Sequence, residues 1–171
     1  DQASVVLLSG GPGTGKTSTV VEILARAEAR HPGLRIGLAA PTGKAARRLG
    51  EAVMAQRAPL PCSTLHRWLE AGRRGFGRHR QRPLELDLLV IDEMSMLDLA
   101  LTQALLEALP SGCRLLLVGD PAQLPPVGSG AVWHRLQQSD VRGRFGAGAV
   151  HLERTYRNRG ALAQVAQQLR Q

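Results

Sequence analysis

The feature that most constrains the fold of this chain is a glycine-rich octapeptide between an apolar run and an amphipathic segment. Residues 10–17 read Gly-Gly-Pro-Gly-Thr-Gly-Lys-Thr, and they follow the apolar run Val5–Leu8. The segment after them has an apolar helical face made of Val20, Ile23, Leu24 and Ala27. A strand that turns directly into a helix is the unit of a parallel sheet, so the chain is predicted to be an α/β protein.

The octapeptide has the form G-x-x-x-x-G-K-T, whose residue types suit a polyphosphate ligand. Glycines let backbone N–H groups point inward around phosphates, and the following helix adds the positive end of its dipole. Lys16 supplies a mobile positive charge, and Thr17 offers a hydroxyl to Mg²⁺. We expect the nucleotide to be bound by Gly11, Pro12, Gly13, Thr14, Gly15, Lys16, Thr17 and Ser18.

Apolar runs alternate with helical patterns along the chain, as in a mostly parallel sheet with helices on both faces. Strands are expected at Ser4–Leu8, Arg35–Ala40, Leu86–Ile91, Arg114–Val118 and Val150–Leu152. Helices are expected after the octapeptide, at Lys44–Arg57, at Leu97–Leu109 and near the end of the chain, around residues 162–169. A chain of 171 residues suits one domain, residues 1–171.

Polar residues follow two of the expected strands. Ligands of open α/β sheets gather at the carboxyl ends of strands, which places Asp92 and Glu93 beside the octapeptide. Asp92 would hold Mg²⁺ through water, and Glu93 would orient and deprotonate an attacking water; alternatively, the pair only caps a helix. The Gln123 amide can reach a γ-phosphate, and Asp120 either joins the Mg²⁺ network or braces the loop. The alternative there is a plain turn held by prolines.

Two further segments have groups suited to nucleic acid. Pro41–Lys44 is a second strand–turn–helix junction, too short to wrap a triphosphate but able to hold one backbone phosphate. Ser63–Arg67 offers a hydroxyl, an imidazole and a guanidinium group in one turn, although a lone histidine such as His66 is as often structural.

The net charge of +8 and the pI near 11.1 indicate a polyanionic partner, unless acidic partner domains balance the charge. Residues 71–83, AGRRGFGRHRQRP, read as a basic surface loop or small hairpin, either solvated or in contact with nucleic acid. No apolar run approaches the ~18 residues of a membrane span, and no signal peptide is visible. Cys62 and Cys113 lack a C-x-x-C partner and read as reduced thiols of a cytoplasmic protein.

Six segments, in order, resemble motifs I, Ia, Ib, II, III and IV of superfamily 1 DNA helicases. They are GGPGTGKT, AAPTGKAARRL, STLHR, LLVIDEMSMLD, LLLVGDPAQLPPVGSGAV and LERTYRN. The DE-x-SM-x-D form of motif II, with TLHR and PTGKAA, resembles the RecD type in particular. That type includes the alpha subunit of the bacterial exonuclease V complex and its free-standing relatives. The resemblance runs from about Val5 to Leu169.

The resemblance implies a RecA-like P-loop NTPase domain, the first of two motor domains of a helicase in recombinational DNA repair or DNA end processing. In such enzymes ATP, with Mg²⁺, binds between the two domains, and closure moves the enzyme along single-stranded DNA, 5′→3′ in the RecD type. By this likeness the ATPase residues are Lys16, Thr17, Asp92, Glu93, Gln123 and Arg157, the last touching the γ-phosphate. The residues on the DNA track would be Thr42, Lys44, Thr64 and His66.

Both ends of the chain look cut, and we expect a fragment of a longer polypeptide. The second motor domain and the upstream glutamine that contacts adenine would lie outside it, so the fragment alone should bind nucleotide weakly and hydrolyse it poorly. Its expected partners are single-stranded DNA, the second motor domain and, for a complex subunit, other exonuclease V-type subunits. Two alternatives remain at this stage: an AAA-type or switch NTPase that does not use DNA as a track, and a non-catalytic DNA-binding subunit. The residues alone leave DNA or RNA, and complex subunit or free-standing enzyme, open.

Overall fold

The computed structural model describes residues 5–123 and 132–152. In this part of the chain the main sheet has the strand order β3-β2-β6-β7-β1-β8, and every neighbouring pair is parallel. The strands are β1 (Val5–Gly10), β2 (Ile36–Ala40), β3 (Cys62–Thr64), β6 (Leu88–Ile91), β7 (Arg114–Gly119) and β8 (Ala149–Leu152). Because all six run the same way, their carboxyl ends meet at one edge of the sheet.

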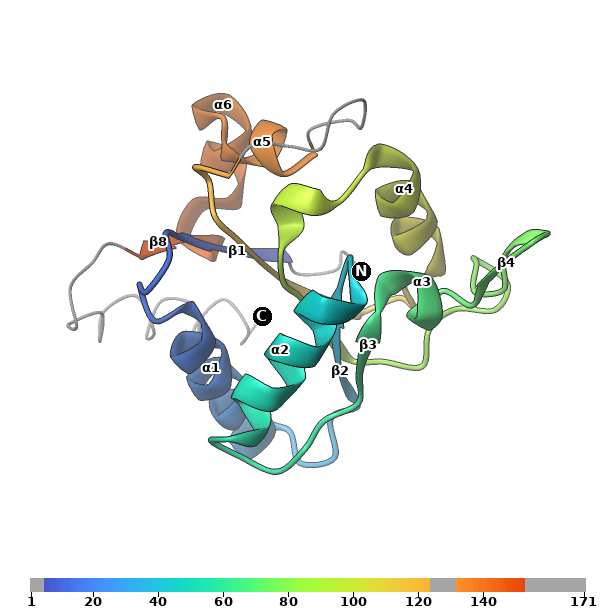
Figure 1. Cartoon of the computed structure of the whole chain (residues 1–171), viewed down its shortest axis with the longest axis horizontal. Helices are drawn as coiled ribbons and strands as arrows, with labels where there is room; N and C mark the ends of the chain where they lie inside the picture. The colour runs from blue at the N-terminus through green and yellow to red at the C-terminus, as the bar shows by residue number, and fades with distance from the viewer. Residues whose placement is uncertain (1–4, 124–131, 153–171) are drawn as a thin grey trace.

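Helices cover both faces of this sheet (Figure 1). The α-helices are α1 (Lys16–Arg30), α2 (Gly43–Met54), α3 (Leu65–Trp68), α4 (Leu99–Ala108), α5 (Val132–Gln137) and α6 (Ser139–Arg142). Two 3-10 segments complete the helical elements, η1 (Met94–Met96) and η2 (Gly143–Gly148).

Alternate residues of each strand supply two separate cores. In β1, Val6 and Leu8 belong to the cluster that contains the buried residues of α1 together with Leu49 and Val53 of α2. Leu7, between them, belongs to the cluster formed with α3, α4 and Trp133 of α5. A strand buried on both faces reads as a continuous apolar run, which is the pattern of β1, β6 and β7. The predicted α/β fold with helices on both faces is confirmed.

The three predicted helices that fall in the described residues are confirmed in place, with shifts at their ends. In α1 the whole predicted apolar face is buried. The helix expected from Leu97 begins later, at Leu99, because the Asp98 side chain accepts a hydrogen bond from the backbone N–H of Leu101 (2.7 Å). Leu97 lies between η1 and α4 and is still buried in the core. The helix expected at residues 162–169 lies outside the described residues.

Two small elements follow β3. The edge strand β3 pairs with β2 and leads into α3, both absent from the sequence-based prediction. Next comes the antiparallel hairpin of β4 (Ala71–Gly72) and β5 (Gly75–Phe76), one of the two forms expected for residues 71–83. It projects from the side of the molecule beyond α3 (Figure 1). In the described ranges, no helix has the length and apolar character needed to cross a membrane.

Candidate functional site

The glycine-rich loop leaves the end of β1 and enters α1. Gly13 and Gly15 have φ values of 71° and 81°, a region that is costly for residues with a side chain. Gly15 is the N-cap of α1, and the Thr14 hydroxyl donates to the carbonyl oxygen of Gly11 (2.8 Å). These features hold the loop in a tight turn at the positive end of α1.

The Lys16 ammonium group folds back onto the loop itself. It donates hydrogen bonds to the carbonyl oxygens of Gly10 (2.6 Å) and Gly11 (2.9 Å). Two backbone carbonyl groups of the loop thus accept the hydrogen bonds of the Lys16 ammonium group.

A cavity of about 500 Å³ opens in front of this loop. It is lined by Pro12, Gly13, Thr14, Gly15, Lys16, Thr17, Ser18, Arg48, Asp92, Glu93, Gly119, Asp120 and Gln123. Of the predicted nucleotide-site residues that the structure describes, all except Gly11 are in this lining. Segments far apart in sequence therefore meet in one cavity at the carboxyl ends of β1, β6 and β7. Arg157 lies outside the described residues.

The two carboxyl groups after β6 are crowded and partly buried. The Asp92 backbone N–H donates to the Ala39 carbonyl oxygen (2.9 Å), and the Asp92 carboxylate accepts from the backbone N–H of Glu93 (2.8 Å). Burial raises the pKa of Asp92, although this N–H and the charges of Lys16 and Arg48 oppose the shift. Burial and then the neighbouring Asp92 charge raise the pKa of Glu93, opposed by Arg48 and then Lys16. The site therefore favours a further cation.

Glu93 also has an unusual backbone. Its φ of 57° and ψ of 42° lie in the left-handed region, which is uncommon for a residue other than glycine. This conformation turns the chain from β6 into η1 and sets Glu93 in the cavity lining. Such strained positions concentrate at functional sites.

Gln123 and Asp120 are positioned by residues that sequence reasoning missed. The buried Ser95 hydroxyl donates to the side-chain carbonyl oxygen of Gln123 (2.9 Å), which links the turn after β7 to η1. The Asp120 carboxylate accepts from the backbone N–H of Ala122 (2.9 Å), and its backbone carbonyl accepts from the Trp133 indole (3.2 Å). Asp120 thus braces the loop while lining the cavity. The serine of the DE-x-SM segment was the available signal for Ser95.

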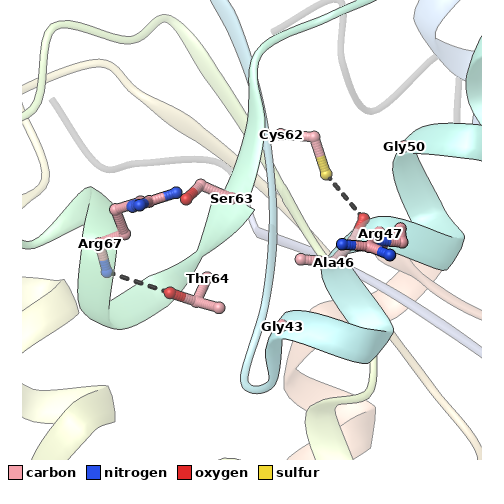
Figure 2. A pocket seen from close by; sticks show the side chains of 8 residues that line it. All are labelled: Gly43, Ala46, Arg47, Gly50, Cys62, Ser63, Thr64 and Arg67. Carbon is pink, nitrogen blue, oxygen red and sulfur yellow. Dashed lines mark hydrogen bonds between the residues drawn. The ribbon is translucent and has the colours of Figure 1, made fainter.

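A second hollow, of about 390 Å³, lies between α2 and the β3–α3 segment. Its lining consists of Gly43, Ala46, Arg47, Gly50, Cys62, Ser63, Thr64 and Arg67 (Figure 2). We call it the track-side hollow, after the predicted nucleic-acid residue Thr64 in its lining. Arg47 comes from α2 on one side and Arg67 from α3 on the other (Figure 2). The sequence had already indicated the Arg67 guanidinium group as part of the Ser63–Arg67 turn, but it gave Arg47 no role. The available signal for Arg47 was its spacing, because it lies three residues after Lys44.

The four predicted nucleic-acid residues divide into two pairs. The hydroxyl oxygens of Thr42 and Thr64 accept hydrogen bonds from the backbone N–H groups of Ala45 and Arg67 (both 3.2 Å), so they cap α2 and α3. Such caps contribute about 1 kcal/mol each to helix stability. Lys44 and His66 are exposed at the starts of the same helices. Only Thr64 of the four lines the track-side hollow.

The basic loop is partly neutralised by Glu70, which precedes it. The Glu70 carboxylate bridges Arg78 (2.8 Å) and Arg82 (2.5 Å), and Arg78 also pairs with Glu85 (3.4 Å). Arg78 first and then Arg82 lower the pKa of Glu70. The loop's other arginines are Arg73, Arg74 and Arg80, all exposed, with no carboxylate partner among the described residues.

Both cysteines are free thiols. Cys113 is buried, and burial raises its pKa to about 11. Cys62 is half-buried and donates to the Ala46 carbonyl oxygen (3.0 Å), a bond seen in Figure 2. Their protonated state agrees with a packing role.

A parallel sheet with a glycine-rich loop between β1 and α1, and paired carboxyl groups after a neighbouring strand, defines a RecA-like P-loop NTPase domain. The model of the AAA domain family matches residues 1–129. The chain therefore belongs to the AAA domain family, and the resemblance to RecD-type superfamily 1 helicases is confirmed by its relatives.

Two curated relatives illustrate the likeness. The chain is 50% identical over 126 residues to the ATP-dependent RecD2 DNA helicase of Deinococcus radiodurans, covering 74% of this chain and 17% of that protein. It is 49% identical over 146 residues to the RecBCD enzyme subunit RecD of Mycobacterium tuberculosis, covering 75% of this chain and 25% of that protein. The chain thus spans a quarter or less of these relatives.

Among solved structures, the Pif1 helicase from Candida albicans superposes with a TM-score of 0.53 at 23% sequence identity, covering 91% of this chain and 37% of that one. This similarity supports the fold.

Proposed function

We propose that residues 1–171 form the first RecA-like motor domain of an ATP-driven DNA helicase that moves along single-stranded DNA, 5′→3′. The observation that carries the proposal is the cavity in which the loop of Lys16, the carboxyl groups of Asp92 and Glu93, and Gln123 meet. These are the groups that phosphoryl transfer from a nucleoside triphosphate needs: a phosphate cradle, metal ligands, a base and a γ-phosphate contact. The names of the RecD-type relatives support ATP and DNA as substrates.

The loop residues would cradle the β- and γ-phosphates of ATP. Lys16 would then exchange its bonds to the carbonyl oxygens of Gly10 and Gly11 for bonds to phosphate oxygens. The exchange replaces two neutral acceptors with charged ones, so it favours the bound state. The positive end of α1 adds to the same attraction.

Mg²⁺ would be held by the Thr17 hydroxyl and, through water, by Asp92. The donors fit: both residues line the cavity, and Asp92 is a partly buried carboxylate with a raised pKa. In residues 5–123 and 132–152, no cluster of three or more histidine, cysteine or carboxylate side chains could bind a metal ion without the nucleotide. The ion would therefore bind together with the phosphates, whose developing charge it neutralises.

Glu93 would orient and deprotonate the attacking water. Its backbone conformation and its place in the lining support this role, because the residue is held at the cavity despite the cost of a left-handed φ. Gln123, held by Ser95, would contact the γ-phosphate and report its loss to η1. Arg157, by motif, would contact the same phosphate.

The nucleic-acid track would run over the N-terminal ends of α2 and α3. Thr42 and Lys44 begin one helix, and Thr64 and His66 lie at the start of the other. Arg47 and Arg67 add two guanidinium groups in the track-side hollow. All of these groups suit backbone phosphate and sugar, so binding would be independent of base sequence.

The full enzyme would include a second motor domain that closes over ATP. Since the relatives are named as a RecD2 helicase and as RecBCD subunits, the protein would act in the bacterial cytoplasm, alone or with exonuclease V-type subunits. DNA repair and recombination are the processes that such an enzyme would serve.

The test is ATPase activity of the full-length protein with and without single-stranded DNA, together with unwinding of a tailed duplex. We expect DNA to stimulate hydrolysis and ATP to drive unwinding from a 5′ tail. Hydrolysis that DNA does not change would favour a switch NTPase instead, and unwinding only from a 3′ tail would overturn the polarity.

A further inference from the structure

Helix α2 presents two consecutive arginines to two different hollows. Arg47 lines the track-side hollow with Thr64 and Arg67. Arg48, the next residue, lines the nucleotide cavity with Lys16 and Glu93. Successive residues of an α-helix project about 100° apart, so adjacent side chains can reach two different hollows. One helix thus lies between the two sites and contributes a guanidinium group to each.

Arg48 changes the charge balance of the nucleotide cavity. Among the described residues, the lining contains three carboxylates, those of Asp92, Glu93 and Asp120, and two cations, Lys16 and Arg48. Lys16 is held by two carbonyl oxygens of its own loop. Without Arg48, Lys16 would be the one cationic side chain that the described lining offers to a polyphosphate, against three carboxylates. A second cationic side chain is therefore needed to offset the three carboxylates, and Arg48 supplies it although it is exposed.

The Arg48 guanidinium group is available for a ligand. Arg48 is exposed, and in the described part of the chain it has no ion pair with any carboxylate. Arg48 and Glu93 line the same cavity, in which the attacking water and the terminal phosphate would lie.

We propose that Arg48 is a further nucleotide-binding residue that contacts the γ-phosphate oxygens, and that α2 thereby ties the nucleotide site to the track-side hollow. This inference rests on the proposed function of the cavity. A guanidinium group suits the position because it is always charged and can donate two parallel hydrogen bonds to phosphate oxygens. The α2 helix reaches both ligands with neighbouring side chains.

A consequence is coupling between the two sites. When the γ-phosphate leaves, Arg48 loses its ligand while Arg47, on the same helix, stays at the track-side hollow. If ATP changes the affinity for single-stranded DNA through α2, DNA must change the affinity for ATP by the same factor. ADP, which lacks the γ-phosphate, should have a much smaller effect.

The test compares four variants of the full-length protein: Arg48→Ala, Arg48→Lys, Arg47→Ala and Lys16→Ala. Affinities for a non-hydrolysable ATP analogue, for ADP and for a fluorescent single strand are measured with Mg²⁺. Arg48→Ala should weaken analogue binding about tenfold, the loss of one charge-assisted contact, and ADP binding by about twofold or less. Arg48→Lys should recover part of the loss. Arg47→Ala, the matched neighbour, should weaken strand binding about fivefold, and its analogue affinity, measured without the strand, should fall less than that of Arg48→Ala.

The coupling is measured as the ratio of strand affinities with and without the analogue. In Arg48→Ala this ratio should move toward one, which means no coupling. In Arg48→Lys it should stay closer to the wild-type value. Equal losses of ATP analogue and ADP affinity in Arg48→Ala, or an unchanged coupling ratio, would overturn the inference. A fold control is the thermal unfolding midpoint, and Arg48→Lys serves as the test if the alanine variant unfolds.

Lys16→Ala separates this inference from the proposed function. If Lys16→Ala loses analogue binding while Arg48→Ala keeps it, Arg48 has no phosphate role and the nucleotide site stands. If Lys16→Ala also keeps full analogue binding, the nucleotide site itself is wrong.

Discussion

The two hollows of this domain present cationic groups in different ways. In the nucleotide cavity, backbone geometry dominates: a glycine turn, a helix N-terminus and the carboxyl ends of strands set positions that side chains then use. The cavity mixes two cations with three carboxylates, as a metal–phosphate ligand requires. In the track-side hollow, side chains dominate: Arg47 and Arg67 share the lining with small residues such as Gly43 and Ala46. No carboxylate is in that lining, as the described residues show.

The difference suggests different tasks. A fixed backbone cradle with opposing charges suits one ligand in one geometry, as phosphoryl transfer needs. Long, flexible arginine side chains suit a backbone phosphate that must be bound, released and replaced by the next one along the strand. Changes in the cavity should therefore alter turnover, and changes near the track-side hollow should alter strand binding.

The largest effect is expected for Lys16→Ala in the full-length protein. The substitution removes the mobile cation that stabilises the charge transferred in the reaction, so ATP turnover should fall by about 10³-fold or more. Steady-state ATPase with saturating single-stranded DNA is the measurement. Strand affinity without nucleotide should stay the same. A turnover within a few-fold of wild type would contradict the assignment of the cavity.

Glu93→Gln should lower turnover by about 10²-fold, because it removes the proposed base but keeps the shape of the side chain. ATP affinity should be kept or increased, since one negative charge near the triphosphate is lost. Equilibrium binding of ATP and single-turnover hydrolysis separate the two effects. An equal fall in affinity and turnover would make Glu93 a binding residue rather than a base.

Asp92→Asn should stabilise the nucleotide-free protein while abolishing Mg²⁺-dependent hydrolysis. Burial raises the pKa of Asp92, so its folded-state pKa exceeds the unfolded value. The contribution of this group to stability is therefore fully present below the unfolded pKa and is lost as the pH rises through the folded pKa. At neutral pH, replacement by the uncharged amide should raise the unfolding midpoint by a few degrees, about 1 kcal/mol.

The control for this prediction is a pH series. The gain of Asp92→Asn over wild type should shrink as the pH falls and Asp92 is protonated. A variant that is less stable than wild type at pH 7 would show that the Asp92 charge is already satisfied in the folded protein.

On the track side, Lys44→Ala and Arg67→Ala should each weaken single-strand binding by about 1 kcal/mol and reduce the salt slope by about one ion. A salt titration of strand affinity provides the measurement. The ATP affinity of both variants should match wild type. Unchanged slopes in both would mean that the basic charge serves another purpose, and the track assignment would be withdrawn.

The smallest effects concern the basic loop. Neutralising Arg73, Arg74 and Arg80 should weaken strand binding by a few tenths of a kcal/mol each, because they are exposed and screened by salt. Their effects on the free energy of strand binding should add to the effect of Lys44→Ala if the loop lies more than ~10 Å from Lys44.

The matched control for the loop is Arg82→Ala. Arg82 pairs with Glu70, so its loss should change strand binding less than the loss of an unpaired neighbour does. A larger effect for Arg82→Ala than for Arg73→Ala would show that the hairpin, rather than its free charge, contacts the strand.

The local pattern of the sequence determined the main parts of this domain. The glycine-rich loop, the apolar face of α1 and the position of Asp92 after a buried strand all follow from neighbours in the chain. Periodicity and turn chemistry act over a few residues, so they can be read without the fold. The rule that ligands gather at carboxyl ends of parallel strands then brought Asp92, Glu93 and Gln123 to the loop.

Tertiary structure alone decided what depends on distant partners. The strand β3 consists of three small or polar residues, Cys62–Thr64, which form a strand by pairing with β2. Ser95 reaches Gln123 across 28 positions, and Glu70 neutralises Arg78 and Arg82 only because the hairpin folds back.

The arginine pair of α2 shows the same limit most clearly. Two identical neighbours in the sequence, Arg47 and Arg48, are assigned to different hollows by the orientation of one helix on the sheet. Composition and spacing do not distinguish the two arginines. The rotation of the helix that separates them is set by the packing of Ala46, Leu49 and Val53 against the core. Side-chain identity is local information, whereas the ligand that a side chain faces is fixed by contacts between elements far apart in the chain.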